Sequence, residues 1–276
     1  MNSNWENFLK NLGEWQGSFT GVSIEGKLTD STPSILNLVG LEDHKLVTFR
    51  LRRYPAGGYS EQPISDTQQE YRSLGKQAVF FDTGAFSKGS LQVAPFTEFG
   101  AEYGFVSANR RLRFVQLFDK QSNFTKLILI REFRSGTDAI ERPHLNVEQL
   151  FGKWEGIACT VYPDWKPADT IATSLTIREI GNGMLEQELS FAGQKITSTA
   201  KIDGNQLNFE GEVPRRILLL PDGGSSNVPL QISHRKSFFV EVGWLVEDHQ
   251  RQRLMRNYND RGEWISSTHI IEHRVG

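Results

Sequence analysis

The chain has 276 residues with a formal net charge of −2 at pH 7. A charge this close to balance disfavours a nucleic-acid-binding protein, which would show a basic domain. Cys159 is the only cysteine, which excludes an internal disulfide and a cysteine-rich zinc site and fits a reducing compartment. The start of the sequence carries no basic segment followed by an apolar run, and no apolar stretch approaches the ~20 residues of a membrane helix. We therefore expect a cytoplasmic protein without a signal peptide or a membrane span.

The first predicted element is a short helix between Ser3 and Leu12. Four apolar residues recur there at helical spacing and form one stripe: Trp5, Phe8, Leu9 and Leu12. Ser3 and Glu6 have the pattern of a capping box, in which each side chain bonds the backbone of the other residue. A shorter helical turn is predicted over residues 146–151, with Asn146 and Gln149 in the corresponding positions.

After each helix the hydrophobic pattern changes to a period of about 2, which is typical of strands. In the first half the predicted strands cover residues 14–24, 34–41, 45–53, 66–73, 77–82, 88–94, 101–107, 111–118 and 124–134. In the second half they cover residues 153–162, 172–180, 184–192, 194–202, 206–212, 215–221, 228–234, 237–247, 251–258 and 263–274. Many short strands after one helix predict an antiparallel sandwich or barrel.

The sequence repeats itself at both ends of its two halves. Gly13-Glu14-Trp15-Gln16-Gly17 returns as Gly152-Lys153-Trp154-Glu155-Gly156, with the tryptophans 139 positions apart (154 − 15). Residues near the end of the first half recur 140 positions later (251 − 111): Arg111, Arg113, Ile130, Glu132 and Arg134 align with Arg251, Arg253, Ile270, Glu272 and Arg274. The match predicts an internal duplication, with one domain at 1–136, a polar linker at 137–145 and a second domain at 146–276.

The Gly-x-Trp that follows each helix resembles the first signature of the lipocalins and the wider calycin superfamily. The matching residues are Gly13 with Trp15 and Gly152 with Trp154. The middle lipocalin signature, Thr-Asp-Tyr, has no clean match. The whole chain, with both copies, is similar to an uncharacterised cyanobacterial and plastid-lineage family of tandem lipocalin-like proteins.

This resemblance implies an all-β fold of two tandem lipocalin-like antiparallel barrels, each preceded by a short N-terminal helix. It also implies that each tryptophan packs at the barrel floor beneath an arginine of the last strand. The best matches for that arginine are Arg134 and Arg274, with Arg113 and Arg253 as second choices. The alternative for the tryptophans is direct stacking on a ligand.

Paired arginines at the same place in both copies are the main candidates for ligand binding. An inward arginine suits a carboxylate, because its fork can pair both oxygens. Arg113 and Arg253, with Arg111 and Arg251, are therefore candidate contacts to a ligand carboxylate, as in related calycin branches. The alternative is that they lie on a solvated outer face. Over residues 237–247 the alternation puts Phe238 and Trp244 on one face, and we expect that face to form the pocket wall.

His269 is a candidate ligand for a cofactor. It aligns with Leu129 of the first copy, an apolar position, and the start of the chain resembles that of nitrobindin-like haem barrels, which take a histidine from late in the chain. The alternative is a hydrogen-bonded core or rim histidine. His273 points to the same side, but four residues along a strand is ~13 Å, too far to share one metal. No metal site is predicted, and the cofactor stays open between haem, a bilin and none.

No common catalytic motif occurs in the sequence, which disfavours an enzyme. Cys159 reads as a small buried hydrophobe, and the aromatic segment from Tyr162 to Pro167 reads either as a lid over the barrel mouth or as a rigid packed loop. We therefore predict a non-catalytic carrier of a small hydrophobic or amphipathic ligand, namely a bilin, another tetrapyrrole or a lipid. The alternatives are an enzyme on the same scaffold, such as a bilin lyase or a lipid isomerase or cyclase, and an interaction module with packed barrels.

Overall fold

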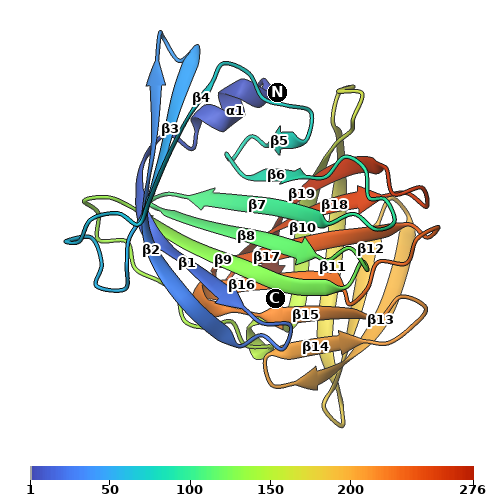
Figure 1. Cartoon of the computed structure of the whole chain (residues 1–276). Helices are drawn as coiled ribbons and strands as arrows, with labels where there is room; N and C mark the ends of the chain where they lie inside the picture. Colours follow the sequence, from blue (N-terminus) through green and yellow to red (C-terminus); the bar gives the residue numbers. More distant parts are fainter. Residues whose placement is uncertain (1) are drawn as a thin grey trace.

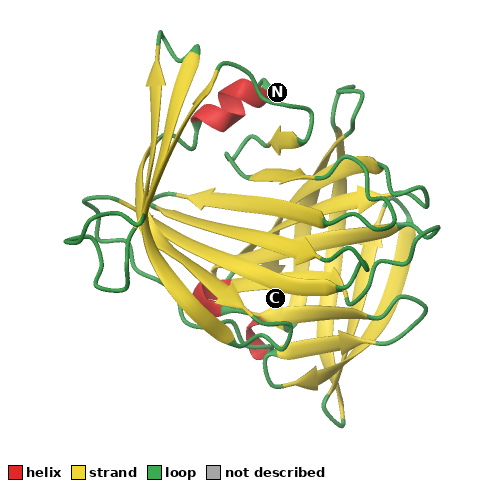
Figure 2. Cartoon of the chain, in the orientation of Figure 1, coloured by secondary structure: helices red, strands yellow, loops and turns green. Residues whose placement is uncertain are grey.

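The computed structural model of the chain describes residues 2–276, and nearly all of its regular secondary structure is β-strand (Figure 1, Figure 2). The first half contains α1 (Asn4–Leu9), β1 (Gly13–Val22), β2 (Leu28–Leu41), β3 (Leu46–Arg53), β4 (Ser65–Tyr71), β5 (Ala78–Phe80), β6 (Phe86–Gly89), β7 (Phe99–Ser107), β8 (Arg110–Phe118) and β9 (Phe124–Arg134). The second half contains the 3₁₀ turns Glu148–Leu150 and Pro221–Gly223, and β10 (Gly152–Val161), β11 (Asp169–Gly181), β12 (Met184–Phe191), β13 (Gln194–Asp203), β14 (Gln206–Phe209), β15 (Arg215–Leu219), β16 (Gly224–Pro229), β17 (Phe238–Glu247), β18 (Gln250–Tyr258) and β19 (Trp264–Val275). We call these halves the first and second units.

The second unit is a closed antiparallel barrel in which each strand pairs with the next along the chain. Its order runs from β10 to β19, and β10 also pairs with β19 to close the ring. Closure removes the free edges that an open sheet must otherwise protect. The predicted barrel of the second half is therefore present.

The first unit is a curled sheet that does not close. Its nine strands follow the order β4-β3-β2-β1-β9-β8-β7-β6-β5, and the edge strands β4 and β5 do not pair with each other. The prediction of a second closed barrel is wrong for this half. The reason lies in β4, whose residues are almost all polar and exposed, so it has no apolar face to bring the sheet round to β5.

Helix α1 bonds the open edge of β5 in place of another strand. Asn4 Nδ2 donates to the Ala78 carbonyl at 2.9 Å and Asn4 Oδ1 accepts from the Phe80 amide at 2.7 Å. Asn7 Nδ2 donates to the Phe80 carbonyl at 3.1 Å. Figure 1 shows α1 beside β5 in the gap of the sheet. Asparagine side chains thus satisfy backbone groups that a neighbouring strand would otherwise pair.

Both predicted helix starts are confirmed. Ser3 and Glu6 form a reciprocal capping box at α1. At the second unit the Asn146 amide donates to Gln149 Oε1, and the Gln149 amide donates to Asn146 Oδ1, each at 3.0 Å. The element that follows is a single 3₁₀ turn of three residues, Glu148–Leu150. The backbone becomes extended again at Phe151, just before β10 begins.

Two strand predictions are displaced, at equivalent places in the two units. β6 covers Phe86–Gly89 where residues 88–94 were predicted, and β16 covers Gly224–Pro229 where 228–234 were predicted. The apolar residues after these strands lie in loops instead. In the first unit that loop contains Pro95, which cannot donate to a ladder, and Phe96 with a φ of 62°.

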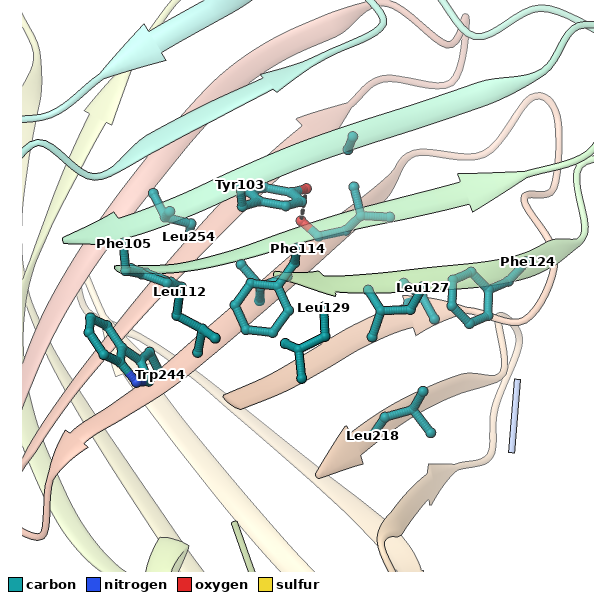
Figure 3. Packing of buried hydrophobic residues seen from close by; sticks show 14 of the residues in the cluster. Tyr103, Phe105, Leu112, Phe114, Phe124, Leu127, Leu129, Leu218, Trp244 and Leu254 are labelled. Carbon is teal, nitrogen blue, oxygen red and sulfur yellow. Dashed lines mark hydrogen bonds between the residues drawn. The ribbon is translucent and has the colours of Figure 1, made fainter. Parts of the chain in front are cut away.

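The largest hydrophobic core of the molecule lies between the two units. It joins outward-facing residues of β7, β8 and β9 to outward-facing residues of β15 to β18 (Figure 3). Phe105 lies 6.1 Å from Trp244 and Phe99 lies 6.0 Å from Phe238, measured between ring centroids. The hydroxyl of Tyr103 donates to the Val240 carbonyl at 3.1 Å. Two smaller cores fill the interiors of the units, one around Trp15 and the other around Trp154.

We expect the two units to unfold together in a single transition, because separating them would expose this shared core to water. In scanning calorimetry of the intact chain the calorimetric enthalpy should equal the van't Hoff enthalpy. Leu36→Ala inside the first unit and Leu185→Ala inside the second should each cost about 2–5 kcal/mol and lower the same Tm. Two transitions, each shifted by only one of the substitutions, would contradict the expectation.

Candidate functional site

The tryptophan at the start of each unit has the same surroundings in both. Trp15 Nε1 donates to the Asn11 carbonyl and Trp154 Nε1 to the Leu150 carbonyl, each at 2.9 Å. Both indoles are completely buried. The tryptophans therefore belong to the interiors of their own units.

Arginines of the last strands cover these indoles. The guanidinium carbon of Arg134 lies 4.4 Å from the Trp15 ring centroid, and that of Arg274 lies 4.7 Å from Trp154. A Cβ on Gly13 would lie 2.2 Å from Arg134 Nη1, so glycine leaves the space through which this arginine reaches the indole. Gly152 occupies the equivalent place with a φ of +113°.

The inward arginines of both units are paired with glutamates of the same chain. Arg113 binds Glu132 through Nη2 at 2.7 Å and through Nε at 2.9 Å, and its Nη1 contacts Glu102 at 2.9 Å. Arg253 repeats the pattern, with Nη2 at 2.6 Å from Glu272 and Nη1 at 2.8 Å from Glu241. All of the polar nitrogens of both arginines are thus used within the protein.

The second arginine of each pair lies between the glutamate and the buried tryptophan of its unit. Arg111 Nη1 lies 3.5 Å from Glu132, and Arg251 Nε lies 3.0 Å from Glu272. Their guanidinium carbons lie 5.7 Å and 5.6 Å from the tryptophan centroids. The structure therefore brings the predicted arginines and the predicted floor residues together into one internal cluster per unit.

Burial and pairing act on these groups in opposite directions. Burial alone would lower the pKa of Arg253, but Glu272 and Glu241 outweigh it and the pKa is raised. Burial alone would raise the pKa of Glu272, but Arg253 and Arg251 outweigh it and the pKa is lowered. For Arg111 burial prevails and lowers the pKa to about 10. These groups are charged at neutral pH, and the paired carboxylates stabilise them.

The sequence did not lead us to predict that four glutamates, Glu102, Glu132, Glu241 and Glu272, pair with these arginines. Glu132 and Glu272 recur 140 positions apart (272 − 132), and Glu102 and Glu241 recur 139 positions apart (241 − 102). The signal was therefore present in the repeat, since a glutamate recurs with each arginine pair.

Little free volume is left inside the closed barrel. Its cavity measures about 110 Å³ and is lined by apolar residues together with Gln187, Asn227, Glu241, Arg251 and Arg253. It is smaller than the ~300–1,000 Å³ of typical small-molecule pockets.

Phe238 and Trp244 lie on the outer face of the second barrel rather than on its inner wall. Both belong to the core shared with the first unit, and Trp244 Nε1 donates to the Asp222 carbonyl at 2.9 Å. The interior face of β17 carries Phe239, Glu241 and Gly243 instead. The alternation of β17 predicted its apolar face correctly. That face packs against the sheet of the first unit and does not line the barrel interior.

A groove of about 490 Å³ lies between the units, and we call it the inter-unit groove. The first unit contributes α1 and the segment 80–83, and the second contributes β10, β19 and the loop 165–168. Its wall is largely apolar, from Phe80, Phe81, Ile157, Cys159, Val161, Trp165 and Ile271. Its polar side chains include Asp82, Lys166 and His269. A mostly apolar cleft of this size with a few polar groups is typical of a ligand site.

His269 lies in this groove and is only 4% exposed. Its Nε2 is 2.9 Å from Gln252 Oε1, and its ring centroid lies 5.3 Å from that of Phe81. Burial lowers the pKa of His269 to about 4, which keeps the imidazole neutral at physiological pH. His273 is exposed on the same strand. In residues 2–276 no group of three or more His, Cys, Asp or Glu side chains could hold a metal ion.

The aromatic segment after β10 borders the groove. Trp165 is 41% exposed with a φ of 55°, and Lys166 Nζ lies 3.9 Å from the Tyr162 ring centroid. Cys159 is half-buried beside it, and burial, with a contribution from Asp82, raises the pKa of its thiol. The sequence left this segment open between a lid over the barrel mouth and a rigid loop packed on the neighbouring domain, and in the structure it borders the inter-unit groove together with residues of the first unit.

A second concave surface covers the outer face of β19, β10, β11 and β12, with a volume of about 800 Å³. We call it the outer groove. It shares Ile157 and Ile271 with the inter-unit groove and adds Ala172 and Phe191. The described chain contains no helix long and apolar enough to cross a bilayer.

Comparison with known proteins places the chain in a family. A protein of unknown function from Nostoc punctiforme, a member of the DUF3598 family, has 45% sequence identity over 100% of both chains and a TM-score of 0.93. The chain belongs to the DUF3598 family. The model of the DUF3598 N-terminal domain matches residues 1–137. Residues 141–275 match the C-terminal domain of "biogenesis factor required for ATP synthase 1".

More distant likenesses add nothing to this assignment. An S-type phycobiliprotein lyase from Guillardia theta has 10% identity over 47% of this chain and 90% of its own, with a TM-score of 0.37. A likeness that weak supports no argument about the DUF3598 chain. No curated protein matches it. The source of the Nostoc relative fits the cyanobacterial family that the sequence resembles.

Glu272→Gln is expected to destabilise the DUF3598 protein by about 3–5 kcal/mol, because Arg251 and Arg253 would lose a buried counter-charge. Urea unfolding at neutral pH measures the effect. Glu42→Gln, in an exposed pair with Arg72, is the control and should leave stability unchanged.

The difference in the free energy of unfolding between the wild type and Glu272→Gln should depend on pH. The folded pKa of Glu272 lies below its ordinary value of 4.5, so its stabilising effect is complete above pH 4.5 and is lost as the pH falls through the folded pKa. The gap between wild type and Glu272→Gln should therefore narrow below pH 4.5. Equal stability of the two at neutral pH would refute the pairing.

Proposed function

We propose that this DUF3598 protein is a non-catalytic binding protein that holds a small amphipathic ligand in the inter-unit groove. The observation that carries the proposal is the contrast in volume, about 490 Å³ in the groove against about 110 Å³ inside the closed barrel. Side chains and ion pairs between the chain's own residues occupy most of the interior of the closed barrel. We therefore place the ligand in the inter-unit groove and not in the barrel, where the sequence led us to expect it.

The groove supplies both kinds of contact that such a ligand needs. Phe80, Phe81 and Ile157 offer apolar surface, which contributes ~25 cal/mol for each Å² removed from water. Lys166 offers a cation with no carboxylate partner in the described chain, and a ligand carboxylate can pair with it. Arg113 and Arg253 are no longer suitable for that contact, since each already binds two glutamates.

The ligand class we propose is a bilin, another tetrapyrrole or a lipid. Each combines a large apolar body with carboxylates or another polar head. Haem as an axially ligated group would have to use His269 Nδ1, because His269 Nε2 already contacts Gln252.

Cys159 gives a direct test of where such a ligand binds. It is the only cysteine and lines the groove, so a bound ligand should slow its alkylation. Purified protein is incubated with biliverdin, haem or palmitate, treated with iodoacetamide above pH 8, and weighed by mass spectrometry. We expect at least one ligand to protect Cys159 with a dissociation constant of tens of micromolar or tighter.

A matched pair of variants controls this experiment. Ile157→Trp fills the groove and should weaken protection at least tenfold, whereas Ile180→Trp should not. The two isoleucines are comparably exposed, at 52% and 48%, but Ile180 does not line the groove. Failure of all three ligands to protect Cys159 or to bind by absorbance or mass would refute the carrier proposal.

A second candidate function is assistance in assembling a protein complex. The family match of residues 141–275 to a biogenesis factor required for ATP synthase favours it. The outer groove, a concave region of about 800 Å³ with the apolar side chains Ile157, Ala172, Phe191 and Ile271, lies on the same half of the chain and is the contact site we propose for an unassembled subunit. The packed interior of the barrel agrees with an interaction module.

For this second function, cells lacking the gene should contain less assembled ATP synthase on native gels. The wild-type gene should restore the amount, and Ala172→Glu, which places a charge in the outer groove, should not. Ile180→Glu, on the same strand outside the groove, is the control and should restore it. An unchanged amount of ATP synthase in cells without the gene would exclude this function.

A further inference from the structure

We infer that the ligand of the inter-unit groove carries an N–H or O–H group that donates a hydrogen bond to Nδ1 of His269. The flat apolar ring of the ligand packs on Phe81. The inference rests on the proposed carrier function and adds the chemical class and orientation of the ligand.

The hydrogen bond to Gln252 decides which nitrogen is free. Nε2 lies 2.9 Å from Gln252 Oε1, and an amide oxygen only accepts, so Nε2 carries the proton. Nδ1 of the neutral ring is then an acceptor. No hydrogen bond reaches Nδ1 from residues 2–276, and it is not among the fully enclosed polar atoms without partners. Nδ1 therefore keeps access to the groove that His269 lines.

The charges beside His269 favour a donor over an anion. The imidazole is neutral, and Phe81 and Phe105 lie against it with centroids 5.3 Å and 6.5 Å away. Asp82 lines the groove and is close enough to act on both His269 and Cys159. A carboxylate entering here would meet a lone pair and a negative charge, whereas a pyrrole N–H or a phenol O–H would find an acceptor.

Comparison of the two units indicates that this polar pair serves the groove. The positions equivalent to His269 and Gln252 in the first unit are Leu129 and Leu112, 140 residues earlier (269 − 129 and 252 − 112). Both leucines are completely buried in the shared core. The same strand positions therefore pack well with apolar side chains, and a buried polar pair is costlier there than leucines. The pair occurs in the unit whose strands line the groove.

The ligand classes proposed above differ in this respect. A bilin or another tetrapyrrole carries pyrrole N–H groups on a flat conjugated system, and its carboxylates lie at a different edge. Its N–H groups can meet His269 while a carboxylate meets Lys166, which also lines the groove. An ionised fatty acid has no donor to offer. The inference therefore favours the tetrapyrrole class over lipids.

Three naphthalene probes of nearly equal size test the inference. 2-Naphthol carries a donor, 2-methoxynaphthalene carries only an acceptor, and 2-naphthoate carries an anion. Protection of Cys159 from iodoacetamide is measured against each probe, and the change in intrinsic tryptophan fluorescence that is lost in Trp165→Phe is a second readout. In the wild type we expect 2-naphthol to bind about tenfold more tightly than 2-methoxynaphthalene, as one hydrogen bond allows. 2-Naphthoate should bind no better than the ether.

The double variant His269→Leu/Gln252→Leu reproduces the pair found in the first unit. It should lose the tenfold preference for 2-naphthol while binding 2-methoxynaphthalene as the wild type does. A preference that survives in the double variant would overturn the role of His269. Equal binding of naphthol and ether by the wild type would overturn the inference without any variant, and would leave the carrier function standing. If no probe protects Cys159 and none of the larger ligands binds, the carrier function itself fails.

Discussion

The structure depends on buried ion pairs in which glutamates neutralise the arginines in the interior of each unit. Each unit places two arginines above its floor tryptophan, and an unpaired guanidinium there would cost several kcal/mol. Glu132 and Glu272 accept the forks of Arg113 and Arg253 and remove that cost. The arrangement holds three strands of each unit in register, because the arginine and its two glutamates lie on neighbouring strands. The charged side chains of the interior therefore serve to hold the strands of the fold together.

These ion pairs leave little room for a ligand in the interior of the closed barrel. The closed barrel retains only about 110 Å³, and the apolar faces of β7 to β9 and of β15 to β18 are covered by the opposite unit. Concave surfaces remain at the seam between the units and on the outer wall of β10 and β19. His269, Cys159 and Ile157 all lie at these surfaces, since the outward side chains of β10 and β19 are not fully covered by the first unit.

Sequence patterns could predict what short stretches of chain determine. The capping pairs and most strands follow from local spacing, and the repeat follows from comparing the two halves of the sequence. The contacts of Trp15 and Trp154 with Arg134 and Arg274 were implied by the resemblance to the calycin superfamily. The failure of the first sheet to close was missed, although the polar run over residues 65–71 that forms β4 is visible in the sequence. The placement of Phe238 and Trp244 needed the other unit, since alternation identifies an apolar face but not what covers it. The inter-unit groove has no sequence signature, because its walls come from segments far apart in the chain.

The contacts of Phe105 with Trp244 and of Phe99 with Phe238 join residues that are counterparts in the two repeats, each 139 positions apart (244 − 105 and 238 − 99). Counterparts touch in this way where an assembly has a twofold axis, as in a symmetric homodimer. The molecule is thus a dimer interface held within one polypeptide. A true homodimer must change both copies at once, whereas a fused pair can alter one half alone. Here the first half has an open sheet where the second has a closed ring of strands, and the second half carries His269 and Gln252 where the first carries Leu129 and Leu112.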